Sequence, residues 1–498
     1  MTTIEGRQQT PAGENPARLR GRDLGILAVL CAAMFLDALD VSMMAVAVPS
    51  IQRSLHMSTA SLQWVISGYV LGYGGFLLLG GRAADVLGRR RVFLTALAGF
   101  AVMSAVGGFA TGGAVLIASR FLKGAAAGFT APAGLSIILA SFAEGPLRHR
   151  ALAVYSVTGA AGFTFGLMAG GLLSEVTWRL VFFVPSIVAL ITLLAAVRLI
   201  PREPAGHQDR PPLDALGAVT VTTAALLLVF TLTEAPGAGW ATVRTIGSLA
   251  GVAVLLAVFA AIERRQASPL IRPGLLAHWP RVRANLGAMA FVGGWAATQF
   301  TATLYMQDLR HWSALETAAA FWPCGVLGLF VAPRLTALVD RFGLLRVLSA
   351  GLALSVAAYA LFLRIGLTSG YWPGLFPTFA LIGIAFGLSF PALNIAATDG
   401  AQPEEQGVAS GLFQTSAQFG TALLLAATTA VTQATARPGT AAGVLHGYRA
   451  GLLVPLLASA AVLALTLAAA LGRHARAADA PAAPLTADDT ADQLRPCA

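Results

Sequence analysis

The sequence predicts an all-α integral membrane protein. Of its 498 residues, 56% are hydrophobic and only 11% are charged, whereas soluble domains carry about 25% charged residues. The apolar residues gather in runs of about 20, the length that a helix needs to span a bilayer. A soluble fold could not cover this much apolar surface, and short arginine clusters between the runs fit a chain that crosses the membrane repeatedly.

About fourteen apolar runs are long enough to be transmembrane helices. We expect them near residues 24–48, 61–80, 92–112, 114–140, 151–173, 180–200, 214–235, 243–262, 284–306, 317–339, 345–366, 374–397, 407–433 and 448–471. An even number of spans puts both ends of the chain on the same side of the membrane.

The arginines indicate which side that is. With the N-terminus inside, most arginine clusters fall in the cytoplasm, among them 18–22, 89–91 and 473–476. This is the asymmetry of the positive-inside rule, and it accounts for the net charge of +10 without a nucleic-acid partner. The acidic loop at 397–406 breaks the pattern, but acidic residues weigh little in the rule. We therefore expect both termini to be cytoplasmic.

The runs divide the chain into predicted parts. These are a cytoplasmic N-tail (1–23), a six-helix bundle (24–200), a cytoplasmic linker (201–213), two inserted transmembrane helices with their loop (214–283), a second six-helix bundle (284–472) and a cytoplasmic tail (473–498). Much of the tail is alanine, proline and aspartate, a composition typical of disorder.

The loop after the second run, GGRAADVLGRRRVF, carries the first motif. Through Gly81, Asp85, Gly88, Arg89 and Arg90 it resembles the signature loop of the major facilitator superfamily, G-x-x-x-D-x-x-G-R-[RK]. Glycines permit a tight turn, and an aspartate can cap a helix or pair with an arginine. The resemblance implies that the loop gates a conformational change. The alternative is an ordinary basic turn.

This resemblance implies a fold. Members of the superfamily have two six-helix bundles around a central cavity, here with two inserted helices between them. The sequence VDRFG at 339–343 looks like a remnant of the same loop, as expected for repeated halves.

The first run contains two aspartates. The segment LDVSMMAVAVP resembles the first-helix motif of the fourteen-helix drug:proton antiporter branch, L-D-x-T-x-x-N-x-A-L-P. Asp40 stands at the motif aspartate, Ser42 at the threonine and Pro49 at the proline, while Ala45 replaces the asparagine. Asp37 is additional and lies on the same helix face, one turn earlier.

An aspartate inside a bilayer is costly, at about 2.5–3.5 kcal/mol on insertion scales. Two neighbouring carboxylates also resist being ionised together. Asp40 and Asp37 therefore suit a site that takes up and releases protons. The alternative is a structural aspartate paired with a cation.

The fourth run contains two cations in LIASRFLKGAAAG. Arg120 and Gly124 match the family pattern L-x-x-x-R-x-x-Q-G, and Lys123, the only lysine in the chain, replaces the glutamine. A charged residue inside a membrane normally faces a wet interior and marks a functional path. We therefore assign Arg120 and Lys123 to proton coupling. The alternative is that they snorkel toward the outer surface.

Helix rise predicts which of these charges meet. Asp40 and Lys123 each lie roughly 13 Å below the outer end of their helix, at 1.5 Å per residue. The first and fourth helices line one cavity in the superfamily, so we expect Lys123 to pair with Asp40 when Asp40 is ionised. The same reasoning puts Arg120 about a turn shallower. Protonation of Asp40 would free Lys123 to lose its own proton or to hold an anionic substrate group.

The fifth run carries a glycine stripe, Gly162, Gly166 and Gly170, followed by Gly171. It resembles the antiporter motif G-x-x-x-G-P-x-x-G-G, with Leu167 in place of the proline. The resemblance assigns these glycines to conformational gating. Ordinary close helix contact is the alternative.

Several polar residues in the runs are candidates to line a substrate cavity. They are Gln63, Tyr69, Gln299, Tyr305, Asn394, Gln414 and Gln418. Hydrogen bonding between helices is the alternative role for each of them.

These observations predict a proton-coupled antiporter that exports a lipophilic small molecule. The alternatives are a proton symporter that imports a metabolite, a membrane enzyme, and a transporter-like sensor. No Walker A, H-E-x-x-H or G-x-S-x-G motif is present, so we expect no enzyme activity, cofactor, catalytic residue or metal. The bias toward arginine and alanine fits a bacterial gene, so we expect a monomer in the bacterial inner membrane whose partners are protons, substrate and lipid.

Overall fold

The computed structural model describes residues 21–142, 145–202, 215–239, 241–265, 278–399, 406–437 and 439–478. Within these ranges the regular secondary structure is entirely helical, which confirms the predicted fold class. The predicted N-tail up to residue 20, most of the linker, and the end of the tail beyond residue 478 lie outside the described residues.

A helix lies over each of the predicted runs. The helices are α1 (Arg22–Leu55), α2 (Thr59–Leu87), α3 (Arg89–Gly108), α4 (Gly113–Ser141), α5 (Pro146–Val176), α6 (Leu180–Leu199), α7 (Ala215–Ala238), α8 (Val243–Glu263), α10 (Trp279–Leu304), α11 (Ala314–Val331), α12 (Leu335–Phe342), α13 (Leu344–Phe362), α14 (Phe376–Thr398), α15 (Gln406–Thr435) and α16 (Ala441–Ala478). Short turns extend three of them: η1 (Tyr305–Leu309) after α10, η2 (Ala332–Arg334) after α11 and η3 (Tyr371–Leu375) before α14.

Helix α16 corrects one predicted boundary. It continues to Ala478, so residues 473–478 are helical and not part of a disordered tail. These residues are alanine, arginine and histidine after Gly472, and alanine and arginine are strong helix formers.

Two glycine turns reveal the repeat within the chain. Gly88, between α2 and α3, has φ 96°, and Gly343, between α12 and α13, has φ 83°. Only glycine adopts this backbone region without strain. Both turns therefore reverse the chain in the same way, which supports the interpretation of VDRFG as a repeat of the signature loop.

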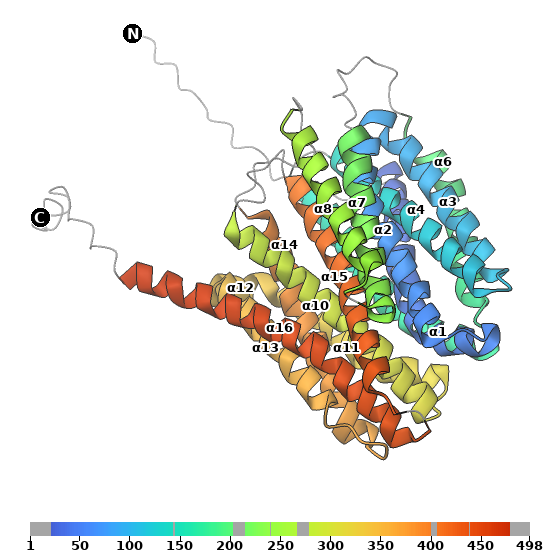
Figure 1. Cartoon of the computed structure of the whole chain (residues 1–498). Helices are drawn as coiled ribbons and strands as arrows, with labels where there is room; N and C mark the ends of the chain where they lie inside the picture. Colours follow the sequence, from blue (N-terminus) through green and yellow to red (C-terminus); the bar gives the residue numbers. More distant parts are fainter. Residues whose placement is uncertain are drawn as a thin grey trace, which may run out of the picture.

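The helices form two groups with a pair between them (Figure 1). Helices α1–α6 pack among themselves, as do α10–α16, while α7 packs on α8 and also contacts α2 and α15. The two groups meet along α5 and α11, and along α2 and α15.

Buried apolar side chains join the two groups at one end and at mid-height, where Val70 and Leu71 of α2 pack with Ala422 of α15. One core cluster contains residues from both groups, such as Met43 and Val48 of α1 together with Phe300 and Phe321 of α10 and α11. At the opposite end, where α1 begins and α16 ends, the cores are separate: one belongs to α1–α6 and the other to α10–α16.

Polar contacts also close the joined end. Gln307 donates from Nε2 to the Val46 carbonyl over 3.0 Å, and the Leu315 amide donates to Glu175 Oε1 over 3.1 Å. The second contact places a carboxylate at the N-terminus of α11, where the helix dipole favours negative charge.

Ten of the described helices meet a simple length and hydropathy criterion for crossing a membrane. The count of fourteen spans and the exact domain boundaries remain predictions.

Candidate functional site

The candidate site lies at mid-helix in α1, at the boundary between two core clusters. Leu36 belongs to the core of α1–α6 alone, and Met43 belongs to the core that both groups share. Asp40 lies between them and has no exposed surface. A fully buried carboxylate requires compensating partners, because its desolvation is costly.

Asp40 has two cationic partners from α4. Arg120 donates from Nη1 to Oδ2, and Lys123 donates from Nζ to Oδ1. The Lys123 contact agrees with the pairing predicted from helix rise. Arg120, expected about a turn shallower, also reaches Asp40, a contact that the sequence analysis did not predict. Helix rise locates only the backbone, and residues three apart share a helix face, so two long side chains can converge on one carboxylate.

Further contacts hold Arg120 in place. Its Nε donates to the Val65 carbonyl of α2 over 3.0 Å, and its Cζ lies 4.4 Å from the centre of the Tyr69 ring. Tyr69 in turn stacks on Tyr73, with 6.2 Å between ring centres. Arg120 is 1% exposed, so it does not snorkel to the surface.

Lys123 is enclosed by α3 and α6. Its Nζ donates to Ser104 Oγ over 2.7 Å, and Ser104 Oγ donates to the Phe182 carbonyl over 2.7 Å. The Nζ also lies 4.6 Å from the ring centre of Phe100 and 5.5 Å from that of Phe182. The sequence analysis did not identify Ser104, Phe100 or Phe182, because each is an ordinary residue within an apolar run.

This environment bears on the predicted role of Lys123. The residues that contact its Nζ, Asp40, Ser104, Phe100 and Phe182, all belong to α1–α6, and its side chain has no exposed surface. The geometry therefore favours coupling to Asp40 over direct contact with a substrate anion.

Asp37 lies one turn from Asp40 and is 8% exposed. It is close enough to Asp40 and Lys123 to interact with them electrostatically. Asp37 is also close enough for electrostatic interaction with three tyrosines, Tyr69, Tyr73 and Tyr155. With both carboxylates ionised, the two aspartates balance the two α4 cations, so one added proton leaves the cluster with a net positive charge.

Glycines allow α2 and α4 to come close enough to build the site. A Cβ at Gly124 would lie 2.0 Å from the Tyr69 carbonyl oxygen, and a Cβ at Gly72 would lie 2.2 Å from that of Phe121. Neither position has room for a side chain. Tyr69 is therefore held directly beside Arg120.

The predicted glycine stripe makes the corresponding contact between α5 and α1. A Cβ at Gly162, Gly166 or Gly170 would lie within 2.8 Å of atoms of α1, among them Ser42 Oγ at 2.1 Å from Gly166. Gly171 instead faces α11, where a Cβ would lie 2.6 Å from Ala318 Cβ. The stripe therefore packs against the helix that carries Asp40, and Gly171 lies at the contact between the two groups.

The signature loop is only partly described. Gly81 and Asp85 lie in α2, but the Asp85 side chain is outside the described part of the structure. Gly88 precedes α3, and Arg89 and Arg90 form its first turn. Arg90 donates from Nε to the Ile200 carbonyl over 2.9 Å and from Nη2 to the Val197 carbonyl over 2.8 Å.

The predicted cavity-lining residues are spread over several helices. Tyr69 lies at the charged cluster, and Gln63 is buried on the preceding turns of α2. Gln418 lies between the two groups, since a Cβ at Gly74 of α2 would lie 2.8 Å from Gln418 Cβ. Asn394 and Gln414 are half-buried on α14 and α15.

Two of these residues are fully enclosed within α10 and its extension. Gln299 is 5% exposed. Tyr305 has no exposed surface, and its hydroxyl donates to the Gly366 carbonyl over 2.7 Å and accepts from Arg310 over 3.0 Å. This part of the structure therefore places Tyr305 in a packed end of the second group, away from Asp40.

A bundle of long apolar helices with a buried charged cluster at its centre is typical of a polytopic membrane transporter. Among the described residues, no group of histidine, cysteine, aspartate and glutamate side chains could hold a metal ion. The chain belongs to the Major Facilitator Superfamily, whose family model matches residues 30–425.

Its curated relatives identify the branch. The chain is 35% identical to the cephamycin export protein CmcT of Amycolatopsis lactamdurans, over 87% of this chain and 89% of that protein. It is 36% identical to the puromycin resistance protein pur8 of Streptomyces alboniger, over 91% and 92%. It is 30% identical to the lincomycin resistance protein of Streptomyces lincolnensis, over 83% and 85%. The resemblance to the drug-efflux branch is therefore confirmed.

Solved structures confirm the fold. The nucleoside transporter NupG aligns with a TM-score of 0.62 at 13% identity, over 90% of this chain and 99% of that chain. A peptide transporter POT in complex with sulfate aligns with a TM-score of 0.62 at 17% identity, over 89% and 94%. At these identities the likeness concerns the fold alone.

Proposed function

We propose that this transporter is a proton-coupled antiporter that exports a lipophilic small molecule across the bacterial plasma membrane. The observation that carries the proposal is the buried Asp40 between Arg120 and Lys123. A carboxylate with two cations can release its proton in the interior of a membrane protein, because the cations compensate its charge. A proton that binds Asp40 breaks both ion pairs and changes the contacts between α1 and α4.

The relatives support the direction of transport and the substrate class. Their names describe export of cephamycin and resistance to puromycin and lincomycin. We therefore propose an antibiotic or a related natural product as the cargo. The arginine asymmetry supports an orientation with both termini in the cytoplasm, and nothing in the proposal requires more than one copy of the chain.

The distribution of core residues fits one step of such a cycle. The two groups share a core at the end distant from the start of α1 and have separate cores at the end where α1 begins and α16 ends. In the proposed orientation this is an inward-facing state, with Asp40 ionised and paired. In this scheme, uptake of a proton from outside and binding of substrate from inside favour different states, and this difference in affinity drives exchange.

The assignment of the glycines to conformational gating rests on helix contacts that are too close for a side chain. The stripe of Gly162, Gly166 and Gly170 packs against α1, and Gly171 packs against α11. We propose that α5 transmits movement of α1 to the contact with the second group. The signature-loop residues are proposed to limit the same movement at the cytoplasmic end.

Everted membrane vesicles test the function. With an acidic lumen, we expect puromycin, lincomycin or a cephamycin to accumulate inside, and addition of the substrate to release protons from the lumen. A symporter would instead use this gradient to move its substrate out of the vesicles. Vesicles without the protein are the control. Accumulation that is unchanged when a protonophore removes the gradient would contradict proton coupling.

A double-mutant cycle tests whether the buried pair is coupled in the working protein. We expect Lys123→Gln and Asp40→Asn to be strongly non-additive in substrate affinity and pH profile, with a coupling energy of about 0.5–3 kcal/mol as for residues in contact. Lys123→Gln combined with Asp308→Asn is the matched control, because Asp308 is exposed on η1. Additive effects of Lys123→Gln and Asp40→Asn would mean that the ion pair has no role in coupling.

A further inference from the structure

Ser104 of α3 is the second hydrogen-bond partner of Lys123, and it has no exposed surface. Its Oγ accepts from Lys123 Nζ over 2.7 Å and donates to the Phe182 carbonyl of α6 over 2.7 Å. Because the hydroxyl proton is donated to the carbonyl, the oxygen presents its lone pairs to Lys123. A neutral amine would direct fewer hydrogens and a lone pair of its own at this oxygen. The hydroxyl therefore favours the charged ammonium form.

The surroundings of Lys123 divide into a charged side and a neutral side. The charged groups that interact with it are Asp40 and Asp37 of α1 and Arg120 of α4. Helices α3 and α6 present the Ser104 hydroxyl and two aromatic rings to its Nζ. A cation is attracted to the face of such rings. The neutral side therefore also suits an ammonium group.

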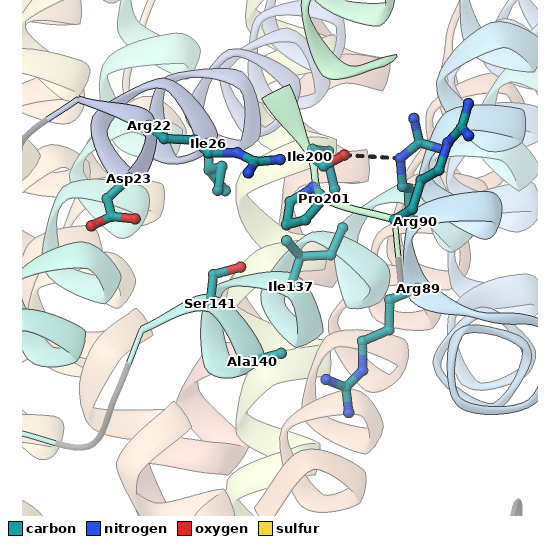
Figure 2. A pocket seen from close by; sticks show the side chains of 11 residues that line it. Arg22, Asp23, Ile26, Arg89, Arg90, Ile137, Ala140, Ser141, Ile200 and Pro201 are labelled. Carbon is teal, nitrogen blue, oxygen red and sulfur yellow. Dashed lines mark hydrogen bonds between the residues drawn. The ribbon is translucent and has the colours of Figure 1, made fainter. Parts of the chain in front are cut away.

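The α3 and α6 segments are joined at several heights by side chains of one that donate to carbonyls of the other. The pairs are Arg90 with Ile200 and Val197, Ser186 with Ala101, Ser104 with Phe182, and Arg179 with Gly108 and Ala110. Figure 2 shows the contact between Arg90 and Ile200. The Phe182 ring also lies close to α3, since a Cβ at Gly107 would lie 2.6 Å from its Cδ1. The two helices therefore form one unit that fixes Ser104 beside Lys123.

The two cations differ from Asp40 in where their other contacts lie. Proton uptake by Asp40 removes the carboxylate that they share. Arg120 can then still donate to the Val65 carbonyl of α2, and Lys123 can still donate to Ser104 of α3. Both α2 and α3 pack on α4, whereas α1 packs mainly on α5. The cations are therefore held with α4 and its neighbours when α1 loses its ion pairs.

We propose that Ser104 is a positioning residue for proton coupling. Its hydroxyl keeps Lys123 ionised and in place while Asp40 takes up and releases a proton. An added proton then makes the cluster more positive and does not merely displace a proton from Lys123. The positive charge beside protonated Asp40 favours release of that proton in the next step. This inference rests on the proposed function, because that function assigns the transported proton to Asp40.

The ionisation of Lys123 can be measured without a substrate, because it is the only lysine in the chain. The purified full-length protein, isotope-labelled at lysine Cε and placed in nanodiscs, gives one lysine signal in nuclear magnetic resonance, and the chemical shift follows ionisation. We expect Ser104→Ala to move the midpoint of this titration to lower pH by about 1–2 units, as for a lost hydrogen bond to a charged group. Ser104→Cys keeps a similar volume and offers a weaker acceptor, so it should give a smaller shift in the same direction.

Ser186→Ala is the matched control for the titration. Ser186 Oγ donates to the Ala101 carbonyl over 2.8 Å, so this change also removes one hydrogen bond between α6 and α3. Ser186 is not among the residues that contact Lys123 Nζ. We expect its titration to match that of the unmodified protein. The same pH dependence in Ser104→Ala and the unmodified protein, or equal shifts in Ser104→Ala and Ser186→Ala, would overturn the proposal.

Export gives the second readout, with puromycin as the probe in everted vesicles. The pH difference across the membrane is held constant while the pH on both sides is raised. Ser104→Ala should lose export first at the alkaline end of the range, where Lys123 loses its proton, and Ser186→Ala should follow the unmodified protein. An equal fractional loss of export at every pH would mean that Ser104 is only structural. Absence of export by the unmodified protein would count against the proposed function, whereas the lysine titration would still decide the role of Ser104.

Discussion

Replacing Asp40 with asparagine is expected to abolish export driven by a pH gradient while the protein still inserts and binds substrate. Asparagine has nearly the same size, but it cannot take up and release a proton. It also removes the negative charge between Arg120 and Lys123. Removal of one partner from a buried ion pair typically costs about 3–5 kcal/mol. In this variant Arg120 can still donate a hydrogen bond to the Val65 carbonyl, and Lys123 can still donate one to Ser104. We therefore expect a destabilised but folded protein.

The measurements are gradient-driven uptake into everted vesicles and substrate binding to the purified variant. Asp308→Asn makes the same chemical change at an exposed position of η1, distant from Asp40, and should leave both unchanged. Asp37→Asn should shift the pH optimum of export without abolishing it, because Asp37 contacts neither cation directly. Export by Asp40→Asn at the parental rate would refute the assignment of Asp40 as the main proton carrier.

Replacing Gly124 with alanine is expected to be strongly destabilising. The added Cβ would lie 2.0 Å from the Tyr69 carbonyl oxygen and 2.8 Å from the carbonyl carbon of the same residue. Both are backbone atoms, so α2 must move away from α4. Overpacking of this kind typically costs about 1–3 kcal/mol. The same movement would take the Tyr69 ring away from Arg120, so we expect export to fall as well.

Gly99→Ala is the matched control for this substitution. Gly99 also faces α4, but its Cβ would lie 3.6 Å from Ala126 Cβ, an ordinary contact distance. Because alanine favours helix by roughly 0.5–1 kcal/mol relative to glycine, Gly99→Ala should keep or slightly raise the melting temperature. Equal melting temperatures for Gly124→Ala and Gly99→Ala would show that α2 and α4 are not in the close contact described here.

The charged cluster shows which contacts the sequence could predict and which it could not. Equal depth in their helices correctly brought Asp40 and Lys123 together, because helix rise is constant along the chain. It did not predict that Arg120 also contacts Asp40, because the reach of a long side chain is not a property of the backbone. Ser104 could not have been found, since a single serine in an apolar run has no distinguishing pattern.

Composition and the length of the apolar runs determined that this chain is an all-α membrane protein, because the bilayer permits few other solutions for so apolar a sequence. The resemblance of the signature loop and of the motifs around Asp40, Arg120 and the α5 glycines to known family motifs predicted its family. The tertiary structure alone decided which charges share a carboxylate and that Lys123 is enclosed by α3 and α6. These facts depend on contacts between residues far apart in the chain, and the packing of helices against one another sets such contacts, whereas local sequence sets only the helices themselves.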